Sequence, residues 1–207
     1  MLNVLCLDLE GVLVPEIWPA VAEHTGIDEL RKTTRDIPVY DDLMQLRLGV
    51  LREHELPLAL IQDVIDGLEP LPGAPEFLGW ARQHFQVAIV SDTFYQFAMP
   101  LMAKLGWPTL LCHQLVVEDG HIVDYRIRQP DPKRRTVQAF QSLHYRVLAA
   151  GDSYNDVSML EEADAGYFFC APENVRTEFP QYPCATDYEG LKRLLETASD
   201  EAAVPTK

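Results

Sequence analysis

Basic residues are scarce in this 207-residue chain. Lys and Arg number 17 against 32 Asp and Glu, which gives a formal net charge of −15. A protein this acidic repels nucleic acid and anionic membranes, so neither is expected as its main partner. An anionic substrate would need local positive charge to overcome this field, and a metal ion with a few Lys or Arg side chains is the usual means.

Cysteine is also rare, and the sequence has no CxxC pair and no Cys/His cluster. The four cysteines are Cys6, Cys112, Cys170 and Cys184. This spacing argues against a zinc site, and a chain of this length needs no disulfide staples. We expect mostly buried thiols in a reducing cytoplasm.

Long hydrophobic runs are missing as well. The first apolar run ends at Asp8 after seven residues and carries no basic segment before it. It is too short for the core of a signal peptide, and no other run approaches the length of a transmembrane helix. The sequence therefore predicts a cytoplasmic protein.

Short apolar runs alternate with stretches of helical periodicity. The runs, which predict buried strands, cover residues 2–7, 86–90, 109–112, 146–150 and 165–170. The predicted helices cover residues 74–84, 94–105, 133–143, 155–162 and 188–197. Such alternation is typical of an α/β protein with a Rossmann-like parallel sheet and helices on both faces. Residues 115–128 instead alternate apolar and polar side chains around Asp119 and Gly120, which predicts a β-hairpin.

Residues 16–72 carry only helical signals, strongest over 41–51 and 58–68. We interpret this block as a helical-bundle cap inserted into a core made of residues 1–15 and 73–201. Pro70, Pro72 and Gly73 suit the return of the chain to the core. Residues 202–207 are predicted to form a flexible tail.

Acidic side chains follow two of the predicted strands. Asp8 and Glu10 come directly after the first, and Asp152, Asn155 and Asp156 follow the strand over 146–150. Ligands of open parallel sheets bind beyond the carboxyl ends of the strands, and Mg²⁺ prefers oxygen ligands. The alternatives are a strand that ends in solvated acids and an Asx-rich turn that caps a helix.

Two further segments are candidates for phosphate binding. Ser91, Asp92 and Thr93 follow the strand over 86–90 and begin the next predicted helix, where a hydroxyl and backbone N–H groups would cradle an anion. Lys133 lies at a predicted helix start, where the helix dipole disfavours a cation. A plain N-cap and a solvated lysine are the alternatives.

The order of these motifs resembles one known family. DLEG at residues 8–11, a helical insert, SDT at 91–93, Lys133 and GDSYND at 151–156 occur as in the haloacid-dehalogenase-like superfamily, in its phosphoserine phosphatase branch. DLEGVLVPEIW and SDTF are most similar to the bacterial subgroup of phosphoserine phosphatases that also transfer phosphate to homoserine. The resemblance implies a Mg²⁺-dependent enzyme that forms an aspartyl-phosphate on phosphoserine, with water or homoserine as acceptor. It does not decide whether the protein forms a homodimer.

The resemblance also implies roles for individual residues. Asp8 would be the nucleophile and Glu10 the general acid and base, although the family usually has Asp at the second position. Asp8, Glu10 and Asp152 would form the metal site. The residues that would bind the phosphate of the substrate are Ser91, Asp92, Lys133 and Asn155. Asp92 stands where the family usually has a glycine.

Glu16 and Arg47 lie near the cap positions where the family pairs the substrate's ammonium and carboxylate. Surface Glu and Arg on helices are often only solvated, which is the alternative at both positions. Two other functions compete with the phosphoserine enzyme. One is a phosphatase of the same superfamily acting on nucleotides or sugar phosphates, and the other is a non-catalytic phospho-receiver module.

Overall fold

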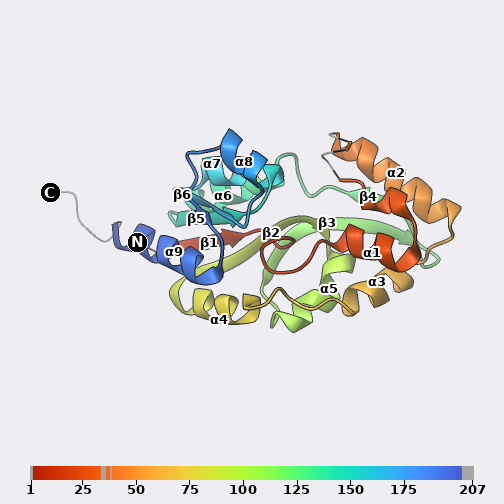
Figure 1. Cartoon of the computed structure of the whole chain (residues 1–207), viewed down its shortest axis with the longest axis horizontal. Helices are drawn as coiled ribbons and strands as arrows, with labels where there is room; N and C mark the ends of the chain where they lie inside the picture. Colours follow the sequence, from red (N-terminus) through yellow and green to blue (C-terminus); the bar gives the residue numbers. More distant parts are fainter. Residues whose placement is uncertain (1, 34–35, 38, 202–207) are drawn as a thin grey trace.

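A seven-stranded sheet forms the centre of the computed structural model, which describes residues 2–33, 36–37 and 39–201 (Figure 1). The strands are β1 (Asn3–Leu7), β2 (Gln86–Phe94), β3 (Thr109–Glu118), β4 (His121–Arg126), β5 (Arg146–Gly151), β6 (Ala165–Phe169) and β7 (Cys184–Ala185). Their order in the sheet is β4-β3-β2-β1-β5-β6-β7. All neighbours are parallel except β3 and β4. The predicted α/β class is confirmed.

Helices cover both faces of this sheet. They are α1 (Ile17–Thr25), α2 (Tyr40–Glu53), α3 (Leu58–Asp66), α4 (Ala74–His84), α5 (Tyr95–Lys104), α6 (Pro132–Ser142), α7 (Val157–Glu162), α8 (Glu173–Glu178) and α9 (Tyr188–Glu201). Alternate residues of β1 divide between two hydrophobic clusters, as the two-residue period of a strand requires. Leu5 and Leu7 pack with α4, α5 and α9, whereas Val4 and Cys6 pack with α6, α7 and α8.

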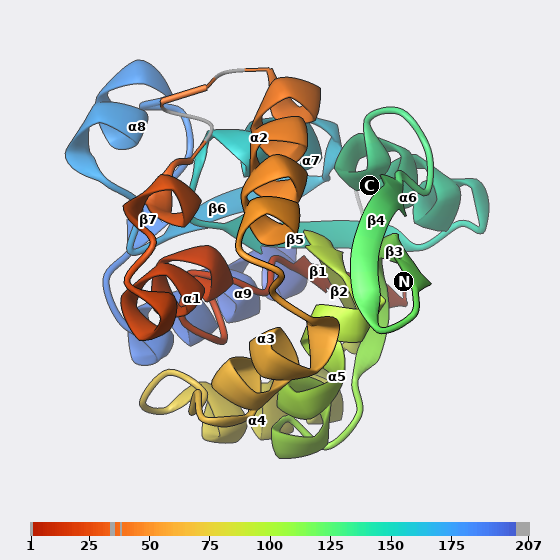
Figure 2. The ribbon, with the colours of Figure 1, turned by 90° about the vertical axis from the view of Figure 1, so that its right-hand side faces the viewer.

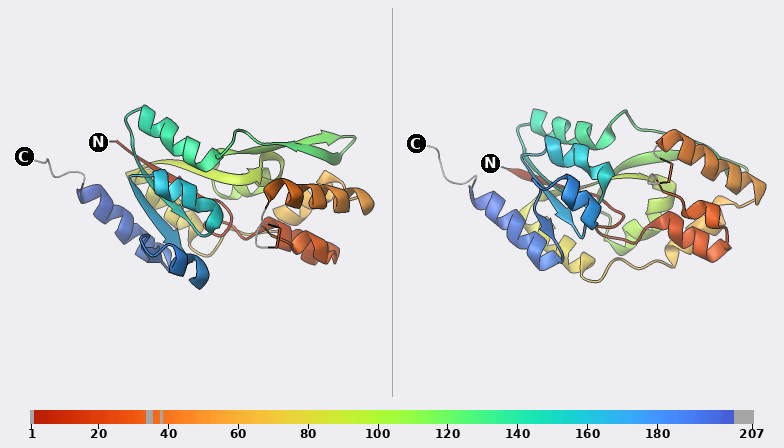
Figure 3. Two further views of the ribbon diagram at one scale, coloured as in Figure 1. Left: turned by 90° about the horizontal axis from the view of Figure 1, so that it is seen from above. Right: turned by 45° about the horizontal axis from the view of Figure 1, so that its top comes forward.

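Helices α1, α2 and α3 lie beyond the carboxyl ends of the strands, at the opposite end of the molecule from α9 (Figure 3). Figure 2 looks onto this end, with the three helices and β4 toward the viewer. The β3–β4 hairpin reaches them, and the Leu58 N–H donates to the Gly120 carbonyl at 2.8 Å. The division into a core and a cap at residues 16–72 remains a prediction.

The predicted elements differ from the structure in three places. Strand β2 continues through Ser91, Asp92 and Thr93, so these residues do not begin a helix, and α5 starts only at Tyr95. The strand predicted over 109–112 runs on to Glu118 and forms the first arm of the hairpin. Short elements α8 and β7 carry too few residues for a clear pattern and were not predicted.

The cysteines are less uniformly buried than expected. Cys6 and Cys112 are buried, Cys184 is half-buried and Cys170 is exposed. Among the described residues, no helix combines the length and apolar character needed to span a bilayer. The predicted tail at 202–207 lies outside the described residues.

Candidate active site

Asp8 lies one residue beyond β1, where its N–H still donates to the Ala150 carbonyl of β5 at 3.0 Å. This bond keeps the chain in the sheet until the carboxylate has been placed at the strand end. The residue as a whole is only 5% exposed. The chain then turns at Gly11, whose φ is +77° and where a Cβ would lie 2.5 Å from Asp152 Oδ2. Glycine therefore allows the turn and leaves room for the Asp152 carboxylate.

The loop after β5 is held by the carboxylate of Asp156. Its Oδ2 accepts hydrogen bonds from the N–H groups of Asp152 at 2.9 Å and Ser153 at 3.0 Å. Ser153 and Asp156 form a capping box at the start of the short 3₁₀ helix Tyr154–Asp156. Gly151 is required here too, because a Cβ would lie 2.2 Å from Asp156 Cγ.

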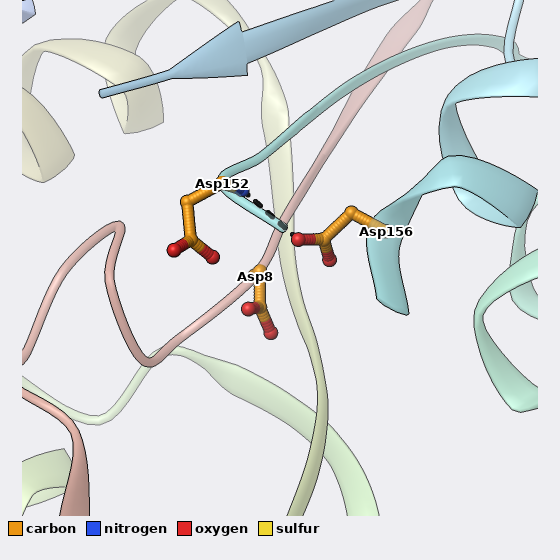
Figure 4. A group of neighbouring side chains, drawn as sticks. All are labelled: Asp8, Asp152 and Asp156. Carbon is orange, nitrogen blue, oxygen red and sulfur yellow. Dashed lines mark hydrogen bonds between the residues drawn. The ribbon is translucent and has the colours of Figure 1, made fainter. Parts of the chain in front are cut away.

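These two segments bring three carboxylates together. Ligand atoms of Asp8, Asp152 and Asp156 lie within 4.8 Å of one another (Figure 4). Asp8 Oδ1 is buried, and Lys133 Nζ lies 3.0 Å from it. An oxygen-only donor set of this kind fits Mg²⁺.

The predicted metal set differs from this carboxylate group at Glu10, whose place at a metal stays a prediction. Glu10 is not part of this carboxylate group, because its Oε2 turns toward α1 and accepts the Ile17 N–H at 2.8 Å. Asp156 takes its place in the group, but both of its oxygens already have partners. Asp8 and Asp152 are therefore the residues best able to offer oxygens to an ion.

Lys133, at the start of α6, is the cation of this cluster and is only 3% exposed. Its Nζ lies 2.6 Å from Asp156 Oδ1, 3.0 Å from Asp8 Oδ1 and 3.7 Å from Asp92 Oδ2. Burial alone would lower the pKa of Lys133, but the carboxylates of Asp156, Asp8 and Asp92 raise it well above its usual value. The lysine therefore stays charged. The neighbouring carboxylates offset the unfavourable interaction of this charge with the dipole at the start of α6.

Three carboxyl groups of the cavity also have raised pKa values. Burial and then Asp156 raise the pKa of Asp8 well above its usual value, although Lys133 opposes the shift. Burial and then Glu16 raise the pKa of Glu10 to about 7, against the hydrogen bond from the Ile17 N–H. Burial and then Asp156 raise the pKa of Asp152 to about 7. A carboxyl group with a pKa near 7 can both donate and accept a proton at neutral pH.

Strand β2 adds polar groups through an irregular segment. Between Val90 and Phe94 its register with β3 shifts, so Ser91, Asp92 and Thr93 bulge toward the carboxyl end of the sheet. All three line the same cavity as Asp8. The hydroxyl and carboxylate are thus placed by a strand bulge and not by a helix N-terminus, which corrects the predicted anion cradle.

The cavity that joins these groups has a volume of about 330 Å³, and residues of α1 and α2 also line it. Arg47 of α2 is 7% exposed there, with its guanidinium carbon 4.4 Å from the centre of the Trp18 ring. One terminal nitrogen donates to the Lys32 carbonyl at 2.9 Å, while the buried Nε has no partner among the described residues. Burial lowers the pKa of Arg47 to about 10, so it remains charged.

All nine predicted site residues line this one cavity: Asp8, Glu10, Glu16, Arg47, Ser91, Asp92, Lys133, Asp152 and Asn155. Glu16 and Asn155 are exposed at its rim. Sequence reasoning missed Trp18 and Tyr40, which also line it. It also missed the buried His113 behind Asp92. Trp18 follows the predicted site residue Glu16 by two positions, so the sequence could have indicated it as a site residue. No sequence pattern around His113 indicates a place in the site.

Comparisons with known proteins agree on one family. The sequence matches the haloacid dehalogenase-like hydrolases over residues 2–164. Phosphoserine phosphatase ThrH of Pseudomonas aeruginosa is 60% identical over 202 residues, which are 97% of this chain and 98% of that protein. A phosphoserine phosphatase of Pseudomonas syringae pv. tomato is 59% identical and is matched over 98% of this chain and 86% of its own length.

Solved structures agree on the fold. A phospho-aspartyl intermediate analogue of phosphoserine phosphatase has a TM-score of 0.78 at 22% identity, and covers 95% of this chain and 98% of its own. A substrate-bound phosphoserine phosphatase complex has a TM-score of 0.77 at 20% identity, with the same coverage. Together with the sequence matches, the aspartates beyond the strand ends and the buried lysine at the start of α6 lead to one conclusion: the chain belongs to the haloacid dehalogenase-like hydrolases.

Proposed function

We propose that this protein is a Mg²⁺-dependent phosphoserine phosphatase that acts through an aspartyl-phosphate on Asp8. The observation that carries the proposal is a single cavity lined by Asp8 and Lys133 and also by Glu16 and Arg47. In the proposal the first pair binds the phosphoryl group and the second pair binds the amino-acid group. The names of the two relatives at 60% and 59% identity support the same substrate.

In this proposal Asp8 attacks phosphorus and the ester oxygen leaves. Mg²⁺ bound by Asp8 and Asp152 would supply positive charge that lowers the repulsion between the carboxylate and the phosphate. The Asp8 carboxylate is held at the strand end, so the attack needs no large movement. An aspartyl-phosphate divides one difficult displacement into two easier ones.

Glu10 is the proton donor and acceptor in this scheme. Its pKa of about 7 gives it a protonated fraction at neutral pH, and the bond from the Ile17 N–H keeps its side chain oriented. Protonated Glu10 gives its proton to the leaving serine oxygen. The resulting carboxylate then removes a proton from the water that attacks the aspartyl-phosphate.

Lys133 and Ser91 would stabilise charge on the phosphoryl oxygens. Lys133 is pre-oriented by its 2.6 Å contact with Asp156, and Ser91 is 4% exposed on the strand bulge. Asn155 at the rim would contact the phosphoryl group from the other side. Lys133 and Ser91 are in place before a substrate enters, which lowers the cost of binding the transition state.

The cap would recognise the amino-acid end. Arg47 offers a planar guanidinium that matches a carboxylate, and Glu16 offers an anion for the ammonium. Trp18 holds the guanidinium from one face, as the 4.4 Å contact shows.

A panel of phosphoesters with Mg²⁺ tests the proposal. We expect phosphoserine to be hydrolysed with a higher kcat/KM than nucleotide or sugar phosphates, because only phosphoserine pairs with both Glu16 and Arg47. Equal or faster turnover of nucleotides or sugar phosphates would contradict it. The finer proposal, that homoserine also accepts the phosphoryl group, is tested by adding homoserine and measuring phosphohomoserine against inorganic phosphate.

A further inference from the structure

Asp92 places a carboxylate where the proposed site has to hold a phosphoryl group. It lines the catalytic cavity on the β2 bulge, and its Oδ2 lies 3.7 Å from Lys133 Nζ. Lys133 is thus flanked by three carboxylates, of which Asp8 and Asp156 are accounted for by attack and by orientation. Lys133 is the only lysine among the described residues that line this cavity, and a third carboxylate beside it weakens the attraction for any anion.

The Asp92 side chain is held in this position by His113, a residue of β3 that is 3% exposed. His113 Nδ1 accepts the backbone N–H of Arg128 at 3.2 Å, so its ring proton lies on Nε2. Nε2 faces Asp92 Oδ1 at 3.6 Å. The Tyr40 hydroxyl also donates to the Asp92 carbonyl at 3.2 Å, which fixes the backbone.

Asp92 also faces a second cavity of about 290 Å³, which shares Tyr40, Asp92 and Asn155 with the first. Among the described residues that line this second cavity there is no Lys or Arg. The carboxylate therefore has Lys133 and His113 as its charged or donating partners, and these lower its pKa against the effect of burial. It stays ionised beside the phosphoryl position.

We propose that Asp92, positioned by His113, is a specificity-determining carboxylate that weakens binding of the phosphoryl group itself. Binding then depends on the amino-acid end of the cavity, and compounds that carry phosphate alone are disfavoured. Specificity is commonly gained in this way, by a repulsive element against the wrong ligand as well as by attraction of the right one. The proposal rests on the proposed function for the identity of that amino-acid end.

Binding of inorganic phosphate to the Mg²⁺-loaded protein tests this without any turnover. Asp92→Asn keeps the shape of the side chain and removes its charge, so the Kd for inorganic phosphate should fall by about tenfold, the effect of removing one nearby like charge. Asp124→Asn on β4 is the control, because Asp124 is exposed and the change in net charge is the same. A fall of less than about threefold relative to this control overturns the proposal.

The role of His113 is tested by a double-mutant cycle. His113→Asn can still accept the Arg128 N–H but is too short to reach Asp92, whereas His113→Gln keeps a donor at that distance. His113→Asn should raise the Kd for phosphate by about threefold, since Asp92 is then free to close on Lys133 and compete with the ligand. His113→Gln should restore the parent value, and neither variant should have an effect when residue 92 is Asn.

An equal effect of His113→Asn with Asp92 or Asn at position 92, or no effect in either, would overturn the positioning role. Thermal melts of every variant check that each is folded. The comparison separates two failures. If Asp92→Asn tightens phosphate binding but phosphoserine is not hydrolysed, the proposed substrate is wrong and the repulsive carboxylate stands. If phosphoserine is hydrolysed but Asp92→Asn does not lower the Kd for phosphate, the proposed function stands and the repulsive role of Asp92 is wrong.

Discussion

Arg47 shows at the scale of one residue how burial changes what an arginine can do. An exposed arginine on α2, such as Arg52, keeps its water shell, whereas Arg47 is 7% exposed and has a buried Nε without a partner among the described residues. A buried cation with open donors is costly unless a ligand completes its hydrogen bonds. This incomplete pairing is the reason to expect that a substrate carboxylate binds here.

Arg47→Ala should lower kcat/KM for phosphoserine by an amount equivalent to ~2–4 kcal/mol, the scale for losing one partner of a buried charge pair. Hydrolysis of p-nitrophenyl phosphate, which has neither amine nor carboxylate, should change little. Arg52→Ala on the same helix is the matched control and should leave both rates near the parent value. Equal losses on both substrates with Arg47→Ala would instead assign the residue to folding or to phosphate binding.

At the scale of elements, the loop between β5 and α7 couples backbone shape to side-chain chemistry. Asp156 ties the loop backbone to Lys133, and it can do so only because Gly151 leaves space for its carboxylate. The loop therefore fixes the lysine and the position of Asp152 together.

Gly151→Ala should disturb this unit, since the new Cβ would lie 2.2 Å from Asp156 Cγ. We expect a destabilisation of ~1–3 kcal/mol, typical of overpacking, and a kcat reduced by at least about tenfold as Lys133 loses its orientation. Gly49→Ala in α2 is the control, because nothing lies within 4 Å of its Cβ position. That substitution should stabilise the protein by ~0.5–1 kcal/mol and leave kcat unchanged. A fully active, stable Gly151→Ala variant would refute the account of this loop.

The sequence predicted those parts of the site that follow local rules. Asp8, Asp152 and Lys133 each lie at the end or start of an element, and parallel strands bring such ends to one edge of the sheet. The bulge that places Asp92 was missed, because it depends on how β2 pairs with β3 and not on the residues of β2 alone. His113 was missed for the same reason, since its contact with Asp92 joins two strands.

The whole molecule is strongly acidic, and several of its carboxylates lie together in the candidate active site. Folding brings Asp8, Asp152 and Asp156 together and leaves Lys133 as their cation. The β3–β4 hairpin, predicted as part of the core, reaches α3 through the bond between Leu58 and Gly120, a long-range contact that no sequence pattern reveals. The sheet, the hairpin and the helices beyond the strand ends thus surround a cluster of like charges, and this arrangement links stability to pH and to metal.

Metal-free protein should lose stability as the pH rises from about 5.5 to about 8. The folded-state pKa values of Glu10 and Asp152 are about 7, raised by burial and then by Glu16 and Asp156 respectively, from ordinary values of 4.5 and 3.8. Groups with a raised folded-state pKa bind protons on folding, so their stabilising effect is complete below the unfolded pKa and is lost as the pH passes 7. The melting temperature should fall by at least ~2–4 °C, which corresponds to ~1 kcal/mol for a chain of this size.

Saturating Mg²⁺ should raise the melting temperature more at the higher pH than at the lower, since protons and the ion compete for the same carboxylates. Asp152→Asn is the control and should reduce this difference, because it removes one of the competing groups. Equal increments at both pH values in the parent protein would show that the ion does not bind at this carboxylate cluster.

The central claim is that Asp8 carries the phosphoryl group, and acid quenching during turnover of phosphoserine tests it most directly. Peptide mass spectrometry of the quenched protein should find one added phosphoryl group on Asp8, removable by hydroxylamine, and Asp8→Asn should show neither the adduct nor turnover. A phosphoryl group on another residue, or undiminished turnover by Asp8→Asn, would contradict the account.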